Sequence, residues 1–214
     1  MLLLALCASL FSVMIPTSAQ RLSVDNLDLP PYKLGLTAGF NASSFSAPHY
    51  DGKAGFHFGV NAIFDASELL QDTYVRTELL FQRKGASQDW ADAKFRTCYL
   101  ELPVHYGYAY LLNKDWTLIG ETGPYVALGI GGRARYDYYD LENHKHRVSE
   151  KFFTNEYMGE DDPRNLDFGW GFHVGAIFQQ NHQLTVGWDF GFINMNDALD
   201  QNRNFMISYT YYVR

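Results

Sequence analysis

Apolar and polar residues alternate strictly in several stretches of this chain after residue 20. The clearest stretch covers residues 184–192, where Leu, Val, Trp and Phe occupy every second position and Thr, Gly and Asp lie between them. Residues 168–178 and 205–213 repeat the pattern. A period of two is typical of β-strands with one apolar face, and it does not fit a helix. The pattern therefore predicts an all-β fold.

Five further strands follow the same period less cleanly, near residues 32–41, 55–64, 73–84, 95–110 and 116–132. Each predicted strand has about ten residues or more, which is the length that a tilted strand needs to cross a bilayer. Eight such strands in succession favour a single antiparallel up-and-down transmembrane β-barrel.

The connections between these strands differ in length. Short, turn-like connections are 65–72, 111–115 and 179–182. Longer, polar connections are 42–54, 85–94, 133–165 and 194–203. Short turns at one end and long loops at the other are the arrangement of outer-membrane barrels, in which the long loops lie outside the cell.

The alternation defines two faces but does not by itself say which of them faces water. A lipocalin shows the same period with its apolar face around a ligand cavity. Here the non-apolar face is rich in Gly, as a narrow lumen requires, and the apolar face carries almost no charge along the central strands. Tyr32, Tyr108, Tyr110 and Trp116 lie near strand ends, as in interfacial girdles. We therefore expect the apolar face to point outward into lipid.

Charged residues and histidines fall on the opposite face, which by parity lines the lumen. This predicted network consists of Lys33, His57, Arg76, Glu78, Lys84, Glu101, His105, Glu121, His173 and Asp189. Side chains can fill an eight-stranded barrel, and charges buried there need partners. We expect Arg76, Lys33 and Lys84 to neutralise some of the acids, which makes the network a structural plug.

Two pairs in the network also have the chemistry for proton transfer, namely Glu101 with His105 and His173 with Asp189. No Ser or Cys nucleophile with a matching triad is evident in the sequence, so we predict no catalytic residues and no enzyme activity. His144 and His146 could share a face as metal ligands, but nothing supplies the other ligands of a closed site. We therefore expect no metal and no cofactor.

The first residues of the chain differ from the rest. An apolar run from Leu2 to Ile15 is followed by Pro16 and by small residues before Gln20. This order predicts a signal peptide over 1–19, removed on export, and a barrel domain over 20–214. The alternative is an N-terminal membrane anchor, for which the run is short. After cleavage Cys98 is the remaining cysteine, which excludes an internal disulfide.

Four segments carry a family resemblance. Residues 35–41 (GLTAGFN), 78–85 (ELLFQRKG), 99–103 (YLELP) and 123–125 (GPY) resemble, in order and spacing, the outer membrane protein β-barrel domain family common in Bacteroidetes, which is porin-like and OmpA/OmpX-like. The resemblance implies an eight-stranded barrel in the cell outer membrane and little about activity. Barrels of this kind usually end in an aromatic residue, whereas this chain ends in Val213-Arg214, a degenerate signal for the barrel-assembly machinery.

Several functions fit such a barrel. The leading interpretation is a non-enzymatic structural or adhesive protein that displays long extracellular loops around a polar, side-chain-filled lumen. A small passive pore and a periplasmic or secreted lipocalin-like ligand-binding barrel are the alternatives. The net charge of −7 argues against nucleic acid as a partner, because binding of its phosphate backbone needs a surplus of Lys and Arg. The expected partners are outer-membrane lipid and, during biogenesis, the barrel-assembly machinery, with the barrel a monomer.

Overall fold

The structure is a computed structural model that describes residues 32–88, 92–140, 142, 144–153, 163–196 and 199–213. The predicted signal peptide over 1–19 and the terminal Arg214 lie outside the described residues. No helix in the described part of the chain is long and apolar enough to cross a membrane.

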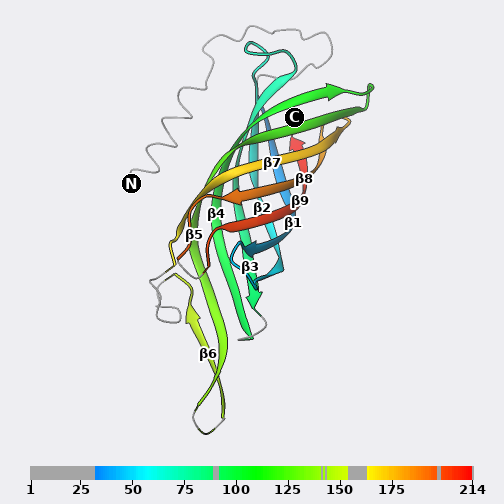
Figure 1. The fold of residues 1–214 in the computed structure, drawn as a ribbon. Coiled ribbons are helices and arrows are strands. Elements are labelled where there is room, and N and C mark those ends of the chain that lie inside the picture. The colour runs from blue at the N-terminus through cyan, green and yellow to red at the C-terminus, as the bar shows by residue number, and fades with distance from the viewer. Residues whose placement is uncertain are drawn as a thin grey trace.

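Nine strands make up a single antiparallel sheet (Figure 1). They are β1 (Tyr32–Phe45), β2 (Asp51–Asp65), β3 (Thr73–Gln88), β4 (Ala93–Leu111), β5 (Trp116–Tyr139), β6 (Lys145–Lys151), β7 (Leu166–Phe178), β8 (His182–Gly191) and β9 (Asn202–Val213). Neighbours in sequence pair with each other except for β6 and β7; β7 pairs instead with β5, and β1 pairs with β9. Eight strands therefore close into a barrel, and the predicted fold class is confirmed.

The ninth strand, β6, lies outside the ring. It pairs with the far part of β5, from Arg133 opposite Lys151 to Tyr139 opposite Lys145. The β5–β6 hairpin extends beyond the other strands, at the end of the barrel opposite the C-terminus (Figure 1). We call this end the hairpin end, and the end where β1 begins and β9 ends the terminal end.

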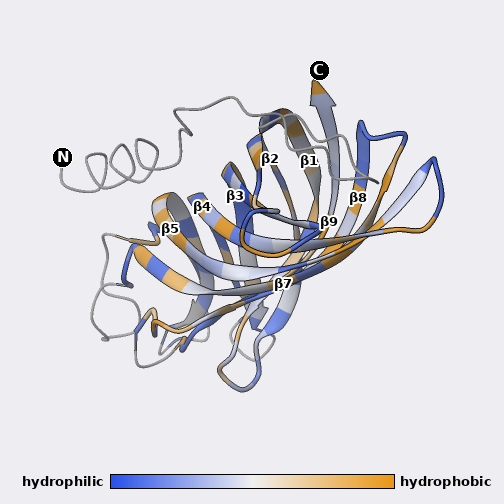
Figure 2. Cartoon of the chain, turned by 90° about the horizontal axis from the view of Figure 1, so that it is seen from above, coloured by the Kyte–Doolittle hydropathy of each residue, from blue (hydrophilic) through white to orange (hydrophobic). Residues whose placement is uncertain are grey.

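The two faces of each strand have opposite chemistry. On β8, Leu184 and Trp188 are exposed on the outside, whereas Thr185 and Asp189 are buried inside. Seen along the barrel, the strands curve into a ring in which hydrophobic and hydrophilic residues alternate (Figure 2). The apolar face therefore points outward, as predicted, and the lipocalin-like arrangement with aromatic residues around an internal cavity is wrong.

Aromatic side chains gather on the outer face near the terminal end. Tyr32, Tyr108, Tyr110 and Trp116 are between 44% and 59% exposed. Amphipathic rings of this kind are typical of the interface between hydrocarbon and headgroups. The apolar band thus has a girdle along its terminal edge.

The long loops predicted at the hairpin end are partly strand. The predicted loops 42–54, 85–94, 133–165 and 194–203 contain the ends of β1, β2, β3, β4, β5 and β9 and the whole of β6. Both faces become more polar there, which hid the alternation, but antiparallel backbone pairing does not require an apolar face. The loop boundaries predicted from polarity were therefore wrong, and the barrel is taller than the apolar band.

The outward face of β7 offers a test of the membrane placement. Val174 is 59% exposed and lies near the middle of the apolar band. We expect Val174→Lys to destabilise the folded barrel in lipid by about 2–4 kcal/mol, because a cation there enters hydrocarbon. The control is Val148→Lys, at a position opposite Tyr136 on β6, outside the ring and beyond the band. Urea unfolding in lipid vesicles measures both; equal stabilities would show that the band does not face lipid.

Candidate functional site in the barrel interior

The structure puts nine of the ten predicted lumen residues inside the barrel as buried side chains: His57, Arg76, Glu78, Lys84, Glu101, His105, Glu121, His173 and Asp189. The tenth, Lys33, is half-buried at the terminal end, where its Nζ donates a hydrogen bond to the carbonyl of Gln180, 3.2 Å away. Strand parity alone thus located the interior set, because successive side chains of a strand alternate between the two faces.

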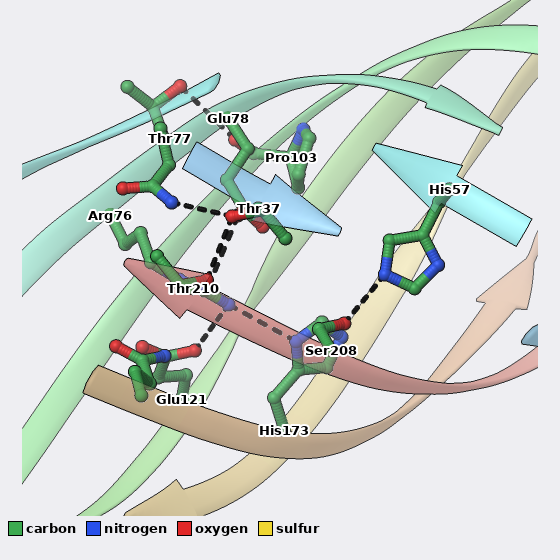
Figure 3. Close-up of polar contacts among 12 residues, drawn as sticks. Thr37, His57, Arg76, Thr77, Glu78, Pro103, Glu121, His173, Ser208 and Thr210 are labelled. Atoms are coloured by element: carbon green, nitrogen blue, oxygen red, sulfur yellow. Dashed lines mark hydrogen bonds and ion pairs between the residues drawn. The ribbon is translucent and has the colours of Figure 1, made fainter. Parts of the chain in front are cut away.

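Arg76 lies at the centre of the interior network (Figure 3). Its Nη2 is 2.5 Å from Glu121 Oε2, and its Nη1 is 3.3 Å from Glu78 Oε1. The same Nη2 is 3.3 Å from Nδ1 of His173. Because a guanidinium can only donate, this Nδ1 is an acceptor, and the ring proton is on Nε2, which donates to Asp189 Oδ1 at 3.1 Å. Arg76 therefore links β3, β5 and β7 directly, and His173 extends the network to β8.

Neutral side chains donate hydrogen bonds to the Oε1 atom of both carboxylates. Tyr74 donates to Glu121 Oε1 at 2.6 Å, and Thr37 donates to Glu78 Oε1 at 3.1 Å. Thr37 Oγ1 also lies 2.8 Å from the Thr210 hydroxyl (Figure 3). Buried charges are tolerated when they are both paired and hydrogen-bonded. The Arg76 layer meets this condition for its acids.

A second charged layer lies nearer the hairpin end. Lys84 Nζ is 2.8 Å from Glu101 Oε2, and Gln82 donates to Glu101 Oε1 at 2.6 Å. The Lys84 ammonium also lies 5.2 Å and 5.4 Å from the ring centres of Tyr99 and Tyr125, which adds cation–π attraction. Of the three predicted cations, Arg76 and Lys84 thus have acidic partners here.

One interior acid escaped the sequence analysis. Asp167 is fully buried and accepts hydrogen bonds from Asn202 at 3.0 Å and from Tyr125 at 3.4 Å. It lies between the predicted loop 133–165 and the predicted start of its strand at 168, so the predicted lumen set omits it. Extending the alternation back by one residue would have found it.

Both ends of the lumen are apolar, which corrects the expectation of a polar interior throughout. At the hairpin end a cluster joins strand residues to residues of the connections: Phe45, Ala86, Ala93, Phe95, Ala134, Phe152, Met195 and Leu199. At the terminal end the cluster is Ile63, Tyr74, Ala109, Ile119 and Tyr212. The charged layers therefore lie between two apolar layers.

Glycines on the inner face make room for these large side chains. A Cβ on Gly107 would lie 2.4 Å from the Tyr74 ring, and one on Gly187 would lie 2.3 Å from the His173 ring. Neither contact is sterically possible without movement. The Gly-rich inner face is thus a consequence of side chains crossing the lumen.

The proposed acid–base pairs are formed only in part. His173 and Asp189 are hydrogen-bonded, whereas Glu101 pairs with Lys84 and Gln82. His57 Nε2 is 2.8 Å from the Ser208 hydroxyl, which resembles a nucleophile–base pair (Figure 3). However, His57 Nδ1 has no hydrogen-bond partner among the described residues, so no acid orients the ring.

His105, Glu121 and His173 come close enough to be considered as metal ligands. One ligand atom from each lies within 4.8 Å of the others, and both ring nitrogens of His105 lack a hydrogen-bond partner among the described residues. The Arg76 guanidinium already contacts both Glu121 and His173. A divalent cation would have to approach this fixed positive charge closely, and the cluster therefore does not fit a metal.

The β5–β6 hairpin has its own charge pairing beyond the barrel. Asp137 accepts hydrogen bonds from Arg147 at 2.9 Å and 3.1 Å, and Lys145 Nζ lies 2.7 Å away. Arg147, followed by Lys145, holds the pKa of Asp137 well below its usual range. His144 and His146 lie beside Asp140, at 3.6 Å and 2.9 Å. The two histidines thus pair with a carboxylate of the hairpin turn.

A comparison with protein families identifies the barrel. The model of the outer membrane protein β-barrel domain matches residues 21–198, most of the chain. The chain belongs to this family. Membership in the outer membrane protein β-barrel domain family agrees with the resemblance found in the sequence and places the barrel in the outer membrane. Among curated proteins, no sequence matches this one.

Solved structures with a similar outline include those of three proteins. Ail of Yersinia pestis, in complex with the heparin analogue sucrose octasulfate, has 12% identity and a TM-score of 0.44, covering 86% of this chain and all of its own. Neisserial surface protein A has 14% identity and a TM-score of 0.48, with 86% and 97% covered. The outer membrane enzyme PagL has 10% identity and a TM-score of 0.49, with 83% and 98% covered.

The Arg76 cluster leads to a test of interior stability. Arg76→Met should lower the free energy of unfolding by about 3–5 kcal/mol, because it leaves two buried carboxylates without their cation. Adding Glu121→Gln should recover part of this loss, since one of the unpaired charges is then neutral. Urea unfolding in lipid vesicles completes the double-mutant cycle. If the two losses simply add, Arg76 and Glu121 are not coupled.

Proposed function

We propose that this outer membrane barrel is a closed, non-enzymatic scaffold that presents its β5–β6 hairpin to the surroundings of the cell. The observation that carries the proposal is the filling of the lumen over its whole height. Two layers of ion pairs, around Arg76 and Lys84, lie between an apolar cluster at each end. Such a sequence of layers supports a barrel that conducts neither ions nor solutes.

The same interior argues against an enzyme. The hydrogen-bonded groups of the His173–Asp189 pair are enclosed within the barrel wall, where a substrate would have to displace the Arg76 layer. The Ser208–His57 pair lacks an orienting acid among the described residues. These groups are better explained as partners that satisfy each other's buried charges.

The hairpin supports the surface-interaction role. It reaches past the rest of the barrel (Figure 1), and its exposed side chains include Lys145, Arg147 and Lys151. Ion pairs to Asp137 hold β5 and β6 together. A charged projection held by ion pairs, on a closed barrel, has the properties of a contact surface. The proposal also includes that the chain is exported by a signal peptide and inserted by the barrel-assembly machinery. It further includes a monomeric state and a Bacteroidetes origin.

Conductance in planar lipid bilayers tests whether the barrel is closed. The wild-type chain should show no steady current steps. A variant that opens all four layers, combining Tyr74→Ala, Arg76→Ser, Lys84→Ser and Phe95→Ala, should admit ions and serves as the positive control. Steady steps from the wild-type chain would instead favour the small passive pore.

Shortening the hairpin tests the contact surface. Tyr136 and Val148 are register partners, so replacing residues 137–147 by Asn-Gly joins β5 directly to β6 through a two-residue turn. The variant should keep the heat-modifiable mobility of a folded barrel on gels. Cells displaying it should adhere less to protein-coated surfaces than cells displaying the wild type. Unchanged adhesion would mean that the hairpin does not make the contact.

A further inference from the structure

Six basic side chains gather on the outer face of the barrel toward the hairpin end. They are Lys53 on β2, Arg83 on β3, Lys94 and Arg96 on β4, and Arg133 and Arg135 on β5. Together they line a groove with a volume of about 490 Å³. We call this set the basic groove. It contrasts with the net charge of −7 of the whole chain.

The strand register forces some of these charges together. Lys94 is directly opposite Arg135, and Arg96 is directly opposite Arg133, in the pairing of β4 with β5. Like charges in directly opposed positions destabilise a sheet. Lys94 has an ion pair with Asp92 at 3.0 Å. Within the part of the chain that the structure describes, the other five side chains make no ion pair.

The basic groove lies directly at the edge of the apolar band. On β2, Phe56 lies three residues after Lys53 and lines the same groove, and on β3 Arg83 follows Phe81 on the same face. On the outer face of β4, the residue after Arg96 is Cys98, and the next is Leu100, which is exposed. This height corresponds to the lipid headgroups of the leaflet on the side of the hairpin, which in an outer-membrane barrel is the outer leaflet.

The charges are confined to one side of the barrel. On the remaining barrel strands β1, β7, β8 and β9, Arg203 is the only Lys or Arg that faces outward within their described ranges. A general attraction to anionic lipid would be served by a ring of charges around the barrel. The grouping of the basic side chains on four neighbouring strands instead fits a single ligand bound at one site.

The floor of the groove continues into an aromatic surface. Phe58 and Phe81 have ring centres 5.2 Å apart, and Phe56 lies 6.3 Å from each of them. Phe58 is 52% exposed. The side chains therefore offer an apolar surface for acyl chains below a set of phosphate-binding groups, since Arg forms bidentate hydrogen bonds with phosphate oxygens.

From this arrangement we infer that the basic groove binds the phosphate groups of a phosphorylated glycolipid of the outer leaflet, with its acyl chains against Phe56, Phe58 and Phe81. The bound phosphates relieve the repulsion between the opposed pairs of β4 and β5. The inference depends on the outer-membrane location of the barrel and not on whether the lumen is closed or the hairpin adhesive.

Binding of fluorescent lipopolysaccharide to the full-length chain in detergent micelles, followed by anisotropy, tests the inference. Arg96→Gln with Arg133→Gln should weaken binding at least tenfold. The matched control is Arg164→Gln with Arg203→Gln, which removes two exposed charges outside the groove and should leave binding unchanged. An equal loss of affinity in the two double variants would show that binding depends only on the overall charge, and this would overturn the proposal.

Two further binding measurements identify which part of the ligand is recognised. Dephosphorylated lipopolysaccharide should bind the wild type weakly, with the same affinity that intact lipopolysaccharide has for the groove double variant. Inorganic phosphate should compete poorly with lipopolysaccharide for the wild type, because it lacks acyl chains. Equally tight binding of the dephosphorylated form, or efficient competition by inorganic phosphate, would overturn the proposed lipid headgroup.

The unfolding midpoint in urea gives a readout that does not depend on the probe. In vesicles of phosphatidylcholine alone, the groove double variant should be at least as stable as the wild type, because a like-charge contact is removed. Added lipopolysaccharide should raise the midpoint of the wild type and not that of the variant. A variant less stable in phosphatidylcholine would show that the arginines serve folding, which contradicts the inference.

Discussion

Pairing of β1 with β9 closes the sheet, and the rest of the structure depends on this closure. The register runs from Leu34 opposite Val213 to Phe45 opposite Asn202. In hydrocarbon, backbone groups find no water, so an unpaired edge strand would leave a row of unsatisfied donors and acceptors. Closure with eight strands also sets the diameter, and a barrel of this size leaves space for side chains and little else.

The narrow lumen explains the chemistry of the interior. Every second residue of each strand must enter it, so large side chains such as Tyr74 need opposing glycines such as Gly107. Charged residues that enter must find partners across the barrel, as Arg76 does with Glu121 and His173. The ion pairs hold strands together from inside, and the apolar clusters at both ends separate these charges from water.

Closure of the sheet also determines which side chains lie on the outer face, and these side chains are surrounded by lipid. Exposed apolar side chains such as Val174 are compatible with hydrocarbon, and the aromatic girdle marks one edge of the band. At the opposite edge the band gives way to the basic groove. There, Arg96 and Arg133 are held face to face by the register of β4 and β5, an arrangement that makes physical sense once an anion lies between them.

Much of this protein was determined by the sequence alone, because strand parity is a local property. The period of two identified the eight barrel strands, their outward faces and the buried positions of residues such as Arg76 and Asp189. It failed where polarity on both faces hid the strand extensions, at Asp167 and in β6. Which interior charges pair, that Phe45 and Phe152 cap the lumen, and that Arg96 lies opposite Arg133 were decided only by the tertiary structure. These contacts depend on the register between strands that are distant in sequence, and alternation within one strand carries no information about that register.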